Sequence, residues 1–305
     1  MKKTNRVVGI LGVGVYDSNF NADFEGDPRS DSNGFSASHV SYKYLIRRYM
    51  ELEGHDVFYK KTIDPKTMNY LDMKGSYEKM FGTLKKNDKK TVTKNLLSCT
   101  DIHNFGTTFA TQGNNIGVRG AVQLTYGRNM YEEASIVSNE CLTPFANSEK
   151  EDAQNTTLGV KSVLDEAHFF FGFTVNPHNY DEYIDVLDDF EGYEEEMYQA
   201  FKRAALSGVS LYASASKTGC ENEFGLFINF KDDKLAIISN LHLDVDFHKE
   251  GKRNVIDLTK VFARIDRLKD DIESIEIFYD DIRTDVIYPV LGGVEVIESN
   301  IVGGI

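Results

Sequence analysis

A nine-residue stretch near the start of the chain reads VVGILGVGV, from Val7 to Val15. It contains three glycines and no charged residue, which is typical of a buried strand with close backbone approaches at its glycines. A dinucleotide-binding fingerprint needs its glycines in the turn that opens a helix, whereas these lie inside the strand. The stretch therefore predicts a central, buried strand and argues against a nucleotide site.

The segments that follow this strand predict an α+β fold. A polar loop from Asp17 to Gly34 precedes a helix that begins at Ser36 or Ser38 and has its apolar side at Val40, Tyr44, Ile46 and Met50. Further strands are expected at residues 57–59, 121–126, 169–175, 224–230, 235–239 and 274–279, the last of them ending the sheet. Helices are expected at residues 181–206, broken near Gly192, and at residues 258–268. The simplest packing of these elements is a sheet with helices on one face.

Composition limits the class of protein. The chain has 305 residues, of which 41% are hydrophobic, and it shows no linker that would separate two domains. No apolar run approaches the ~20 residues of a membrane span, and the basic N-terminus lacks the cleavage pattern of a secretory signal. The cysteines Cys99, Cys141 and Cys220 are far apart, which excludes a zinc ribbon and a disulfide framework. We expect a cytoplasmic protein without a membrane contact or a cofactor.

The net charge of −14 is unevenly distributed along the chain. Residues 1–130 contain 19 lysines and arginines against 13 acidic residues, and the remaining residues contain 15 against 35. A polyanion responds to the local field of a surface, so the basic first part can bind nucleic acid in spite of the total. The alternative interpretation is a lysine-rich loop combined with an acidic surface helix.

Two patterns are candidates for metal or acid–base chemistry. His242, Asp244, Asp246 and His248 alternate, so on a strand they would share a face, but four ligands in one line seldom converge on a metal ion. The chain has seven histidines, and no pattern pairs any of them with a nucleophile. The sequence therefore predicts no metal site and no catalytic residue.

Lys43 and Arg47 are four residues apart, so they lie on one face of the predicted helix. Two cations in this arrangement can bridge adjacent phosphates. A solvated helix face fits the same spacing equally well.

Several short motifs follow one another in a fixed order. They are the Asn- and Gly-rich loop from Tyr16 that ends in Asp27-Pro28-Arg29, the helix with Lys43 and Arg47, the segment Asp101–Gly106, the strand Gly120–Gln123 with Gly127-Arg128 after it, the turn Gly159–Ser162, and the element Ser214–Gly219. With these motifs the chain resembles the backbone subunit of type I CRISPR Cascade surveillance complexes, a branch of the RAMP superfamily, and is closest to the type I-B (Csh) lineage. The resemblance extends from about residue 6 to about residue 280. It departs from the family pattern at His103, Ala121, Ser162 and Ala215, where Arg, Pro, His and Arg are usual.

This resemblance implies a single domain over residues 1–305 with a ferredoxin-like, RRM-type core sheet. It implies an inserted finger region at about residues 60–95 and a projecting thumb hairpin at about residues 138–158, and we expect an acidic helical insertion at about residues 178–207. Near the base of the thumb, Leu142, Pro144 and Phe145 would displace a base of the bound RNA.

The function that the resemblance implies is that of a non-catalytic subunit. Several copies bind head-to-tail along one CRISPR RNA with other Cascade subunits, and the guide recognises a target DNA strand by base pairing. The RNA-binding residues that we assign on this basis are Asn19, Arg29, Lys43, Arg47, Arg48, His103, Arg119, Gln123, Arg128, Lys161, Ser216 and Lys217. The alternative from another class is a RAMP-type, metal-independent endoribonuclease that processes CRISPR precursor RNA with a histidine such as His39 or His103.

Overall fold

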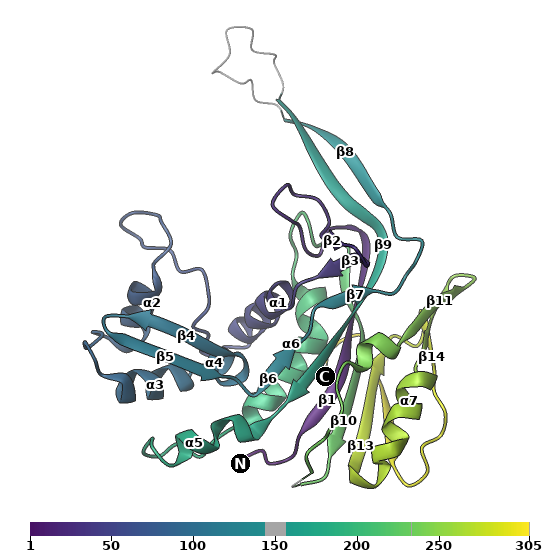
Figure 1. Cartoon of the computed structure of the whole chain (residues 1–305). Coiled ribbons are helices and arrows are strands. Elements are labelled where there is room, and N and C mark those ends of the chain that lie inside the picture. Colours follow the sequence, from purple (N-terminus) through teal and green to yellow (C-terminus); the bar gives the residue numbers. More distant parts are fainter. Residues whose placement is uncertain (144–156, 233, 305) are drawn as a thin grey trace.

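A twisted ten-stranded sheet forms the centre of the protein in the computed structural model, which describes residues 1–143, 157–232 and 234–304 (Figure 1). Its strand order is β15-β13-β10-β1-β9-β7-β3-β2, and β6 and β8 also pair with β9. The strands of this sheet are β1 (Val7–Ser18), β2 (Ser30–Asp31), β3 (Gly34–Ala37), β6 (Val122–Leu124), β7 (Gly127–Asn129), β8 (Ile136–Thr143), β9 (Thr157–Val175), β10 (Cys220–Phe230), β13 (Ile272–Tyr279) and β15 (Glu295–Asn300).

The glycine-rich strand β1 lies at the centre of this sheet, antiparallel to β9 on one side and to β10 on the other. Val8, Ile10 and Val13 are 4%, 0% and 0% exposed, so the prediction of a central, buried strand is confirmed. A Cβ atom at Gly9 would lie 1.9 Å from the carbonyl oxygen of Leu226, so the neighbouring strand can approach only a glycine there.

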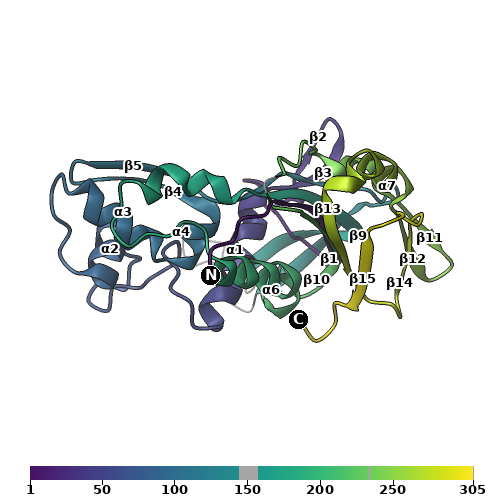
Figure 2. The same cartoon turned by 90° about the horizontal axis from the view of Figure 1, so that it is seen from below.

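Both faces of the sheet are covered. Helices α1 (His39–Leu52) and α6 (Glu195–Leu211) pack on one face, and α7 (Thr259–Ile265) lies on the opposite side (Figure 2). A three-stranded sheet of β11 (Asp246–Glu250), β12 (Arg253–Asp257) and β14 (Thr284–Ile287) accompanies α7. The expectation of helices on one face was therefore wrong, because the last third of the chain folds back over the second face.

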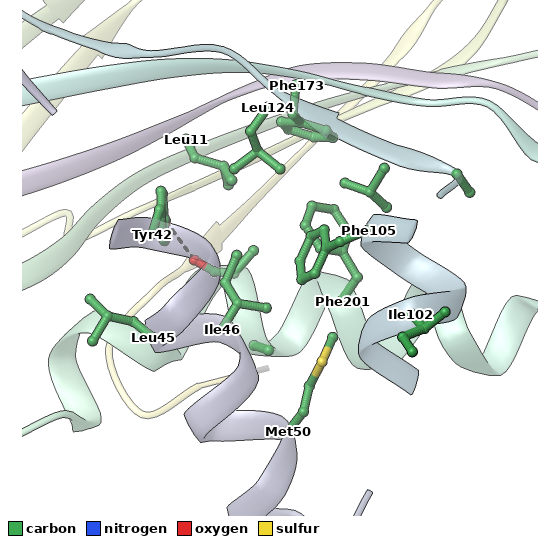
Figure 3. Close-up of a cluster of buried hydrophobic side chains, with 14 of the residues drawn as sticks. Leu11, Tyr42, Leu45, Ile46, Met50, Ile102, Phe105, Leu124, Phe173 and Phe201 are labelled. Atoms are coloured by element: carbon green, nitrogen blue, oxygen red, sulfur yellow. Dashed lines mark hydrogen bonds between the residues drawn. The ribbon is translucent and has the colours of Figure 1, made fainter. Parts of the chain in front are cut away.

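Helix α1 begins at Ser38, whose hydroxyl oxygen accepts a hydrogen bond from the backbone N–H of Ser41 at 3.2 Å. Its buried side chains Tyr42, Leu45, Ile46 and Met50 pack against the sheet and α6, as the close-up in Figure 3 shows. Of the expected apolar residues, Ile46 and Met50 are buried and Tyr44 is half-buried, whereas Val40 is exposed.

Residues 60–119 form a separate lobe beside the sheet, at the left of Figure 1. The lobe contains α2 (Met73–Phe81), α3 (Lys89–Leu97), α4 (Thr100–Phe105) and the two-stranded sheet of β4 (Gly106–Thr111) and β5 (Asn114–Arg119). Residues 57–59 form no strand, contrary to expectation. The backbone N–H groups of Phe58 and Tyr59 donate instead to the carboxylate of Asp101, at 2.8 and 3.0 Å.

Strand β8 and the first part of β9 form a long hairpin that projects from the body (Figure 1). Pairing runs from Ile136 opposite Leu164 to Thr143 opposite Thr157. The expected thumb at residues 138–158 falls on this hairpin, with residues 144–156 outside the described part of the chain.

The second half of the chain differs from expectation at three places. The stretch 178–207 is not one insertion, because α6 packs in the core with Phe201 and Ala204 fully buried, while α5 (Asp181–Ile184) is a short helix outside it. Residues 235–239 form no strand, since β1 and β13 already occupy both edges of the preceding strand β10. Strand β13 is followed by β14 and β15, so it does not end the sheet. Within the described residues, no helix combines the length and the hydropathy that crossing a bilayer requires.

Candidate nucleic-acid interface

Helix α1 lies between the 60–119 lobe and the central sheet (Figure 1), and its polar side chains contact residues from distant parts of the chain. His39, Lys43 and Arg47 follow one another along α1 at i, i+4 and i+8. Lys43 is itself buried, three residues before buried Ile46, so this row borders the packed face of the helix. We call this region the α1 surface and define it by Asn19, Arg29, His39, Lys43, Arg47, Arg119, Gln123, Tyr126, Lys161 and Lys217.

One end of the α1 surface lies at the base of the β8–β9 hairpin. The ammonium of Lys217 donates to the carbonyl oxygen of Phe20 at 2.6 Å, and burial lowers the pKa of Lys217. The backbone N–H of Asn19 donates to the carbonyl oxygen of Ser216 at 2.8 Å, and the side-chain amide of Asn19 donates to the carbonyl oxygen of Ser162 at 3.4 Å. Lys161 donates to the carbonyl oxygen of Ala215. The structure thus brings together four of the residues that the sequence suggested from three separate motifs.

The middle of the α1 surface contains Arg29 and Arg128. The guanidinium of Arg29 lies 5.8 Å from the ring centroid of Tyr126 and is exposed to solvent. Arg128 is paired with Asp31 at 2.6 Å, which leaves it less available to a phosphate than Arg29. The ring of His39 meets that of Tyr126 edge-on at 5.4 Å, so the start of α1 joins this group.

Lys43 and Arg47 lie where α1 meets the 60–119 lobe, but neither is a freely solvated cation. Burial and the neighbouring charge of Arg47 lower the pKa of Lys43 to about 8. Arg47 donates to the fully buried carboxylate of Asp101 at 3.0 Å. Both cations lie over the ring of Phe105, at 4.8 and 5.1 Å from its centroid. Arg47 therefore has a structural partner in addition to any ligand.

Arg119 and Gln123 extend the α1 surface beyond the ring of Phe105. Arg119 is exposed and pairs in register with Gly106, the residue that follows Phe105. Gln123 donates to the carbonyl oxygen of Gly120 at 3.0 Å. A Cβ atom at Gly106 would lie 2.2 Å from the carbonyl oxygen of Val118, which explains the glycines at this junction.

Two of the predicted residues, His103 and Arg48, do not join the α1 surface as exposed ligands. His103 is 1% exposed, its Nε2 atom lies 3.1 Å from the carbonyl oxygen of Gly192, and burial lowers its pKa to about 4. Arg48 pairs with Glu51 on the next turn of α1. Ser216 contributes its backbone carbonyl to Asn19, as described above. Because His103 faces the interior, neither an RNA contact nor an acid–base role fits its position.

Of the three residues predicted near the base of the thumb, only Leu142 is described, and it lies next to the last pair of the β8–β9 ladder, away from the base. Leu142 lies in β8 with its backbone in register with Leu158. Pro144 and Phe145 lie outside the described residues.

The predicted alternation at residues 241–248 is interrupted. Residues Leu241–Asp244 form a short 3-10 turn and β11 begins only at Asp246, so the four candidate ligands do not share a strand face. Among the described residues, no group of three or more His, Cys, Asp or Glu side chains is arranged to hold a metal ion.

Sequence reasoning missed two aromatic residues of this region, Tyr59 and Tyr126. Each lies beside a guanidinium, Tyr59 next to Arg47 at 5.1 Å and Tyr126 next to Arg29. Aromatic rings next to cations can stack on bases while the cations neutralise phosphates. In the sequence, each tyrosine stands at the end of an apolar run. This position could have pointed to a surface ring, but it is equally typical of a buried one.

The sequence matches the family model described as CRISPR-associated protein Cas7 over residues 5–265. A search of curated protein sequences gives no match.

Two solved structures illustrate the structural similarity. A chain of a "CRISPR RNA-guided surveillance complex" aligns with a TM-score of 0.53 and 13% identity over 95% of this chain and 94% of that chain. A chain of a "CRISPR RNA-guided surveillance complex, pre-nicking" aligns with a TM-score of 0.52 and 13% identity over 93% of this chain and 97% of that chain. At this identity the similarity shows a shared fold.

Proposed function

The chain belongs to the Cas7 family of CRISPR-associated proteins, and from this premise we propose that it is a non-catalytic, guide-RNA-binding backbone subunit of a CRISPR surveillance complex. Several copies would bind head-to-tail along one CRISPR RNA, together with other subunits of a type I complex, and the paired guide would recognise a target DNA strand. The observation that carries this proposal is the continuous α1 surface, which joins the base of the hairpin to the 60–119 lobe.

The core topology that we infer is ferredoxin-like, of the RRM type. In chain order, β1, α1, β6, β9, α6 and β10 alternate as strand, helix, strand, strand, helix, strand. In the sheet, β10, β1, β9 and β6 are neighbours in that order, and all three pairs are antiparallel. This arrangement places α1 and α6 on one face, and it supports the type of core that the sequence resemblance implied.

The proposed RNA contacts are of two kinds. Arg29, Arg119 and Lys161 are exposed, and each neutralised phosphate would release counterions and so favour binding. Lys43 and Lys217 are largely buried and already contact protein groups. They would therefore hold the bound RNA in position rather than attract it from solution. Asn19 and Gln123 would complete the surface with hydrogen-bonding groups.

The β8–β9 hairpin is proposed as the thumb, with Leu142, Pro144 and Phe145 as the residues that displace a base. Residues 136–140 are all exposed, although Ile136 and Val137 are apolar, and Val160 on the paired strand is 69% exposed. Exposed apolar side chains on a projecting ribbon need a partner to cover them. A neighbouring copy and the bound RNA would supply that cover.

The experiment that tests the proposal is to purify the protein from cells that contain its CRISPR RNA and to sequence the RNA that copurifies. We expect intact RNA of guide type, protected at a regular interval by successive copies. Repeat sequences in that RNA also test the proposed type I-B lineage. Random cellular RNA, or no RNA, would contradict the proposal. Cleavage of a repeat RNA by the purified protein without metal would instead support an endoribonuclease, for which half-buried His39 is the better placed of the two histidines.

A further inference from the structure

The loop formed by residues 60–71 joins Tyr59 to helix α2 and exposes an unusual share of apolar surface. Ile63, Met68 and Tyr70 are 48%, 73% and 60% exposed. In Figure 1 this loop rises above α2, on the side of the molecule from which the β8–β9 hairpin projects. A surface loop whose large side chains pack on nothing in its own chain is a candidate for contact with another molecule.

The 60–71 loop is internally braced. Ile63 and Tyr70 form an antiparallel bridge, and the backbone N–H of Asp64 donates to the carbonyl oxygen of Asn69 at 2.8 Å. The Asp64 carboxylate accepts hydrogen bonds from the backbone N–H of Lys66 at 2.9 Å and from the Thr67 hydroxyl at 3.1 Å. The backbone of the tip therefore has a defined shape.

Met68 at this tip has a φ angle of +59°, in the left-handed region that favours Gly, Asn and Asp. The conformation is unfavourable for a residue with a large side chain. A glycine or an asparagine would satisfy the backbone at lower cost, so the fold alone gives no reason for an exposed methionine here.

Cations surround the apolar tip. The ammonium of Lys61 lies 5.4 Å from the ring centroid of Tyr70. The segment 60–95 contains ten lysines against four acidic residues, so the loop sits on a basic lobe. Tyr59, where the loop begins, stacks beside Arg47 of the α1 surface. The loop thus begins beside the α1 surface and continues onto the lobe.

We propose that the 60–71 loop is a base-stacking element for the single-stranded guide RNA. The thioether of Met68 inserts between two bases, the ring of Tyr70 stacks on a base, and the exposed Lys61 and Lys66 neutralise the adjoining phosphates. Apolar wedges of this kind unstack neighbouring bases, and aromatic platforms hold a base without reading its sequence. This inference rests on the proposed function, because it assigns a second contact to the same RNA.

The test compares three variants of the full chain for binding to a single-stranded RNA that carries 2-aminopurine at successive positions. Met68→Asn keeps the left-handed backbone and removes the apolar wedge, and Tyr70→Ala removes the ring. Val290→Asn, a change at a 95% exposed valine in the segment between β14 and β15, is the matched control. Wild type and Val290→Asn should bind equally and raise the fluorescence of one or more probes as bases unstack. Met68→Asn should lose that signal, and Tyr70→Ala should bind about tenfold more weakly.

The outcomes separate this inference from the proposed function. If wild type binds RNA but Met68→Asn matches Val290→Asn in both affinity and fluorescence, the loop proposal is wrong and the proposed function stands. If wild type binds no RNA, the proposed function itself fails. If Tyr70→Ala does not fold, the result for Met68→Asn alone tests the loop proposal, since asparagine tolerates the left-handed backbone at position 68. Protection of the loop by another protein subunit in the absence of RNA would overturn the assignment to RNA.

Discussion

At the scale of single residues, His168 is held inside the protein between two carboxylates. Its Nδ1 atom lies 2.7 Å from Glu223 and its Nε2 atom lies 3.2 Å from Glu166, and the ring stacks on Phe247 at 4.0 Å. Lys249 of β11 reaches Glu166 at 2.6 Å. These contacts join the root of the hairpin in β9 to β10 and to the small sheet, so the protonation of His168 affects how three elements are held together.

The stability of the protein should therefore depend on pH through this group. Burial alone would lower the pKa of His168, but the charge of Glu223 and hydrogen bonds to both glutamates outweigh it and raise the pKa to about 9. A raised pKa stabilises the fold fully below the unfolded value near 6.5 and loses that contribution as the pH rises through about 9. The hydrogen bond from His168 and the charge of Lys249 lower the pKa of Glu166 to about 2, so its contribution is lost only as the pH falls toward that value.

Taken as the difference between wild type and His168→Gln, the contribution of His168 to the free energy of unfolding should fall by on the order of 2–3 kcal/mol between pH 6 and pH 10. The opposite slope that Lys43 adds in this range, because its pKa is lowered to about 8, cancels in that difference. Urea unfolding of both proteins across this range measures the difference. His168→Gln should be less stable at pH 6 and should lack the contribution of His168, whereas His178→Gln, at an exposed ion pair with Asp181, should keep it. A wild-type slope retained in His168→Gln would show that another group titrates.

A second residue-level prediction separates the two roles of Arg47. Arg47→Ala leaves the fully buried carboxylate of Asp101 without its cation, which should lower the free energy of unfolding by about 2–4 kcal/mol. Arg48→Ala, which removes a surface pair with Glu51, should cost less than about 1 kcal/mol. Chemical denaturation without RNA gives both values. Equal and small effects would mean that Arg47 serves the ligand alone.

At the scale of elements, some segments were predictable because their own residues dictate them. The strand at Val7–Val15 needed only its apolar run, and the start of α1 needed only a serine before a periodic helix. Residues 57–59 and 235–239 have equally strand-like residues but no free partner, since pairing is decided by strands far away in the chain. Likewise nothing near β10 indicates that its neighbours come from residues 7–15 and 272–279.

The junction between the 60–119 lobe and the central sheet gives a prediction at this scale. Gly106 has a φ angle of +76° and ends α4 against the backbone of Val118, so a side chain would both strain it and collide. Gly106→Ala should lower the free energy of unfolding by more than about 2 kcal/mol. Gly117→Ala in the same two-stranded sheet meets nothing within 4 Å and should change it by less than about 1 kcal/mol. Similar melting temperatures for the two variants would mean that the backbone around Gly106 can move to accept a side chain.

At the scale of the whole molecule, the sequence was a good guide to which segments lie close together. It was a poorer guide to which of their side chains are exposed and unpaired. Motifs at residues 19, 161 and 217 do meet at the base of the hairpin. Burial decided the rest, because a sequence pattern does not indicate that His103 faces the interior or that Arg47 and Arg128 already have carboxylate partners. Substitutions of the exposed cations therefore test the proposed RNA surface most directly, because these cations have no buried carboxylate partner among the described residues.

The combined variant Arg29→Ala, Arg119→Ala and Lys161→Ala should weaken RNA binding for every sequence tested. Each lost phosphate contact should reduce the slope of log K against log salt by about 0.7, so the three together should reduce it by about 2. The matched control replaces Lys252, Arg267 and Lys269, which lie on the opposite side of the sheet. Filter binding at several salt concentrations measures both slopes. The same reduction in the control would indicate a general effect of charge rather than a surface.

The β8–β9 hairpin gives the last prediction, since it projects from the body and its described residues contribute little to the core. Asn139 and Lys161 are partners in the ladder, so replacing residues 140–160 by Asn-Gly closes the hairpin with a turn that suits antiparallel strands. Buried Val163 and Leu164 are retained, so the melting temperature of the monomer should stay within a few degrees of wild type. If the hairpin is the thumb that contacts the next copy, the shortened protein should bind RNA as single copies and form no ordered multimers, which electron microscopy and sedimentation measure. Multimers with the wild-type repeat would place the contact between copies on another part of the molecule.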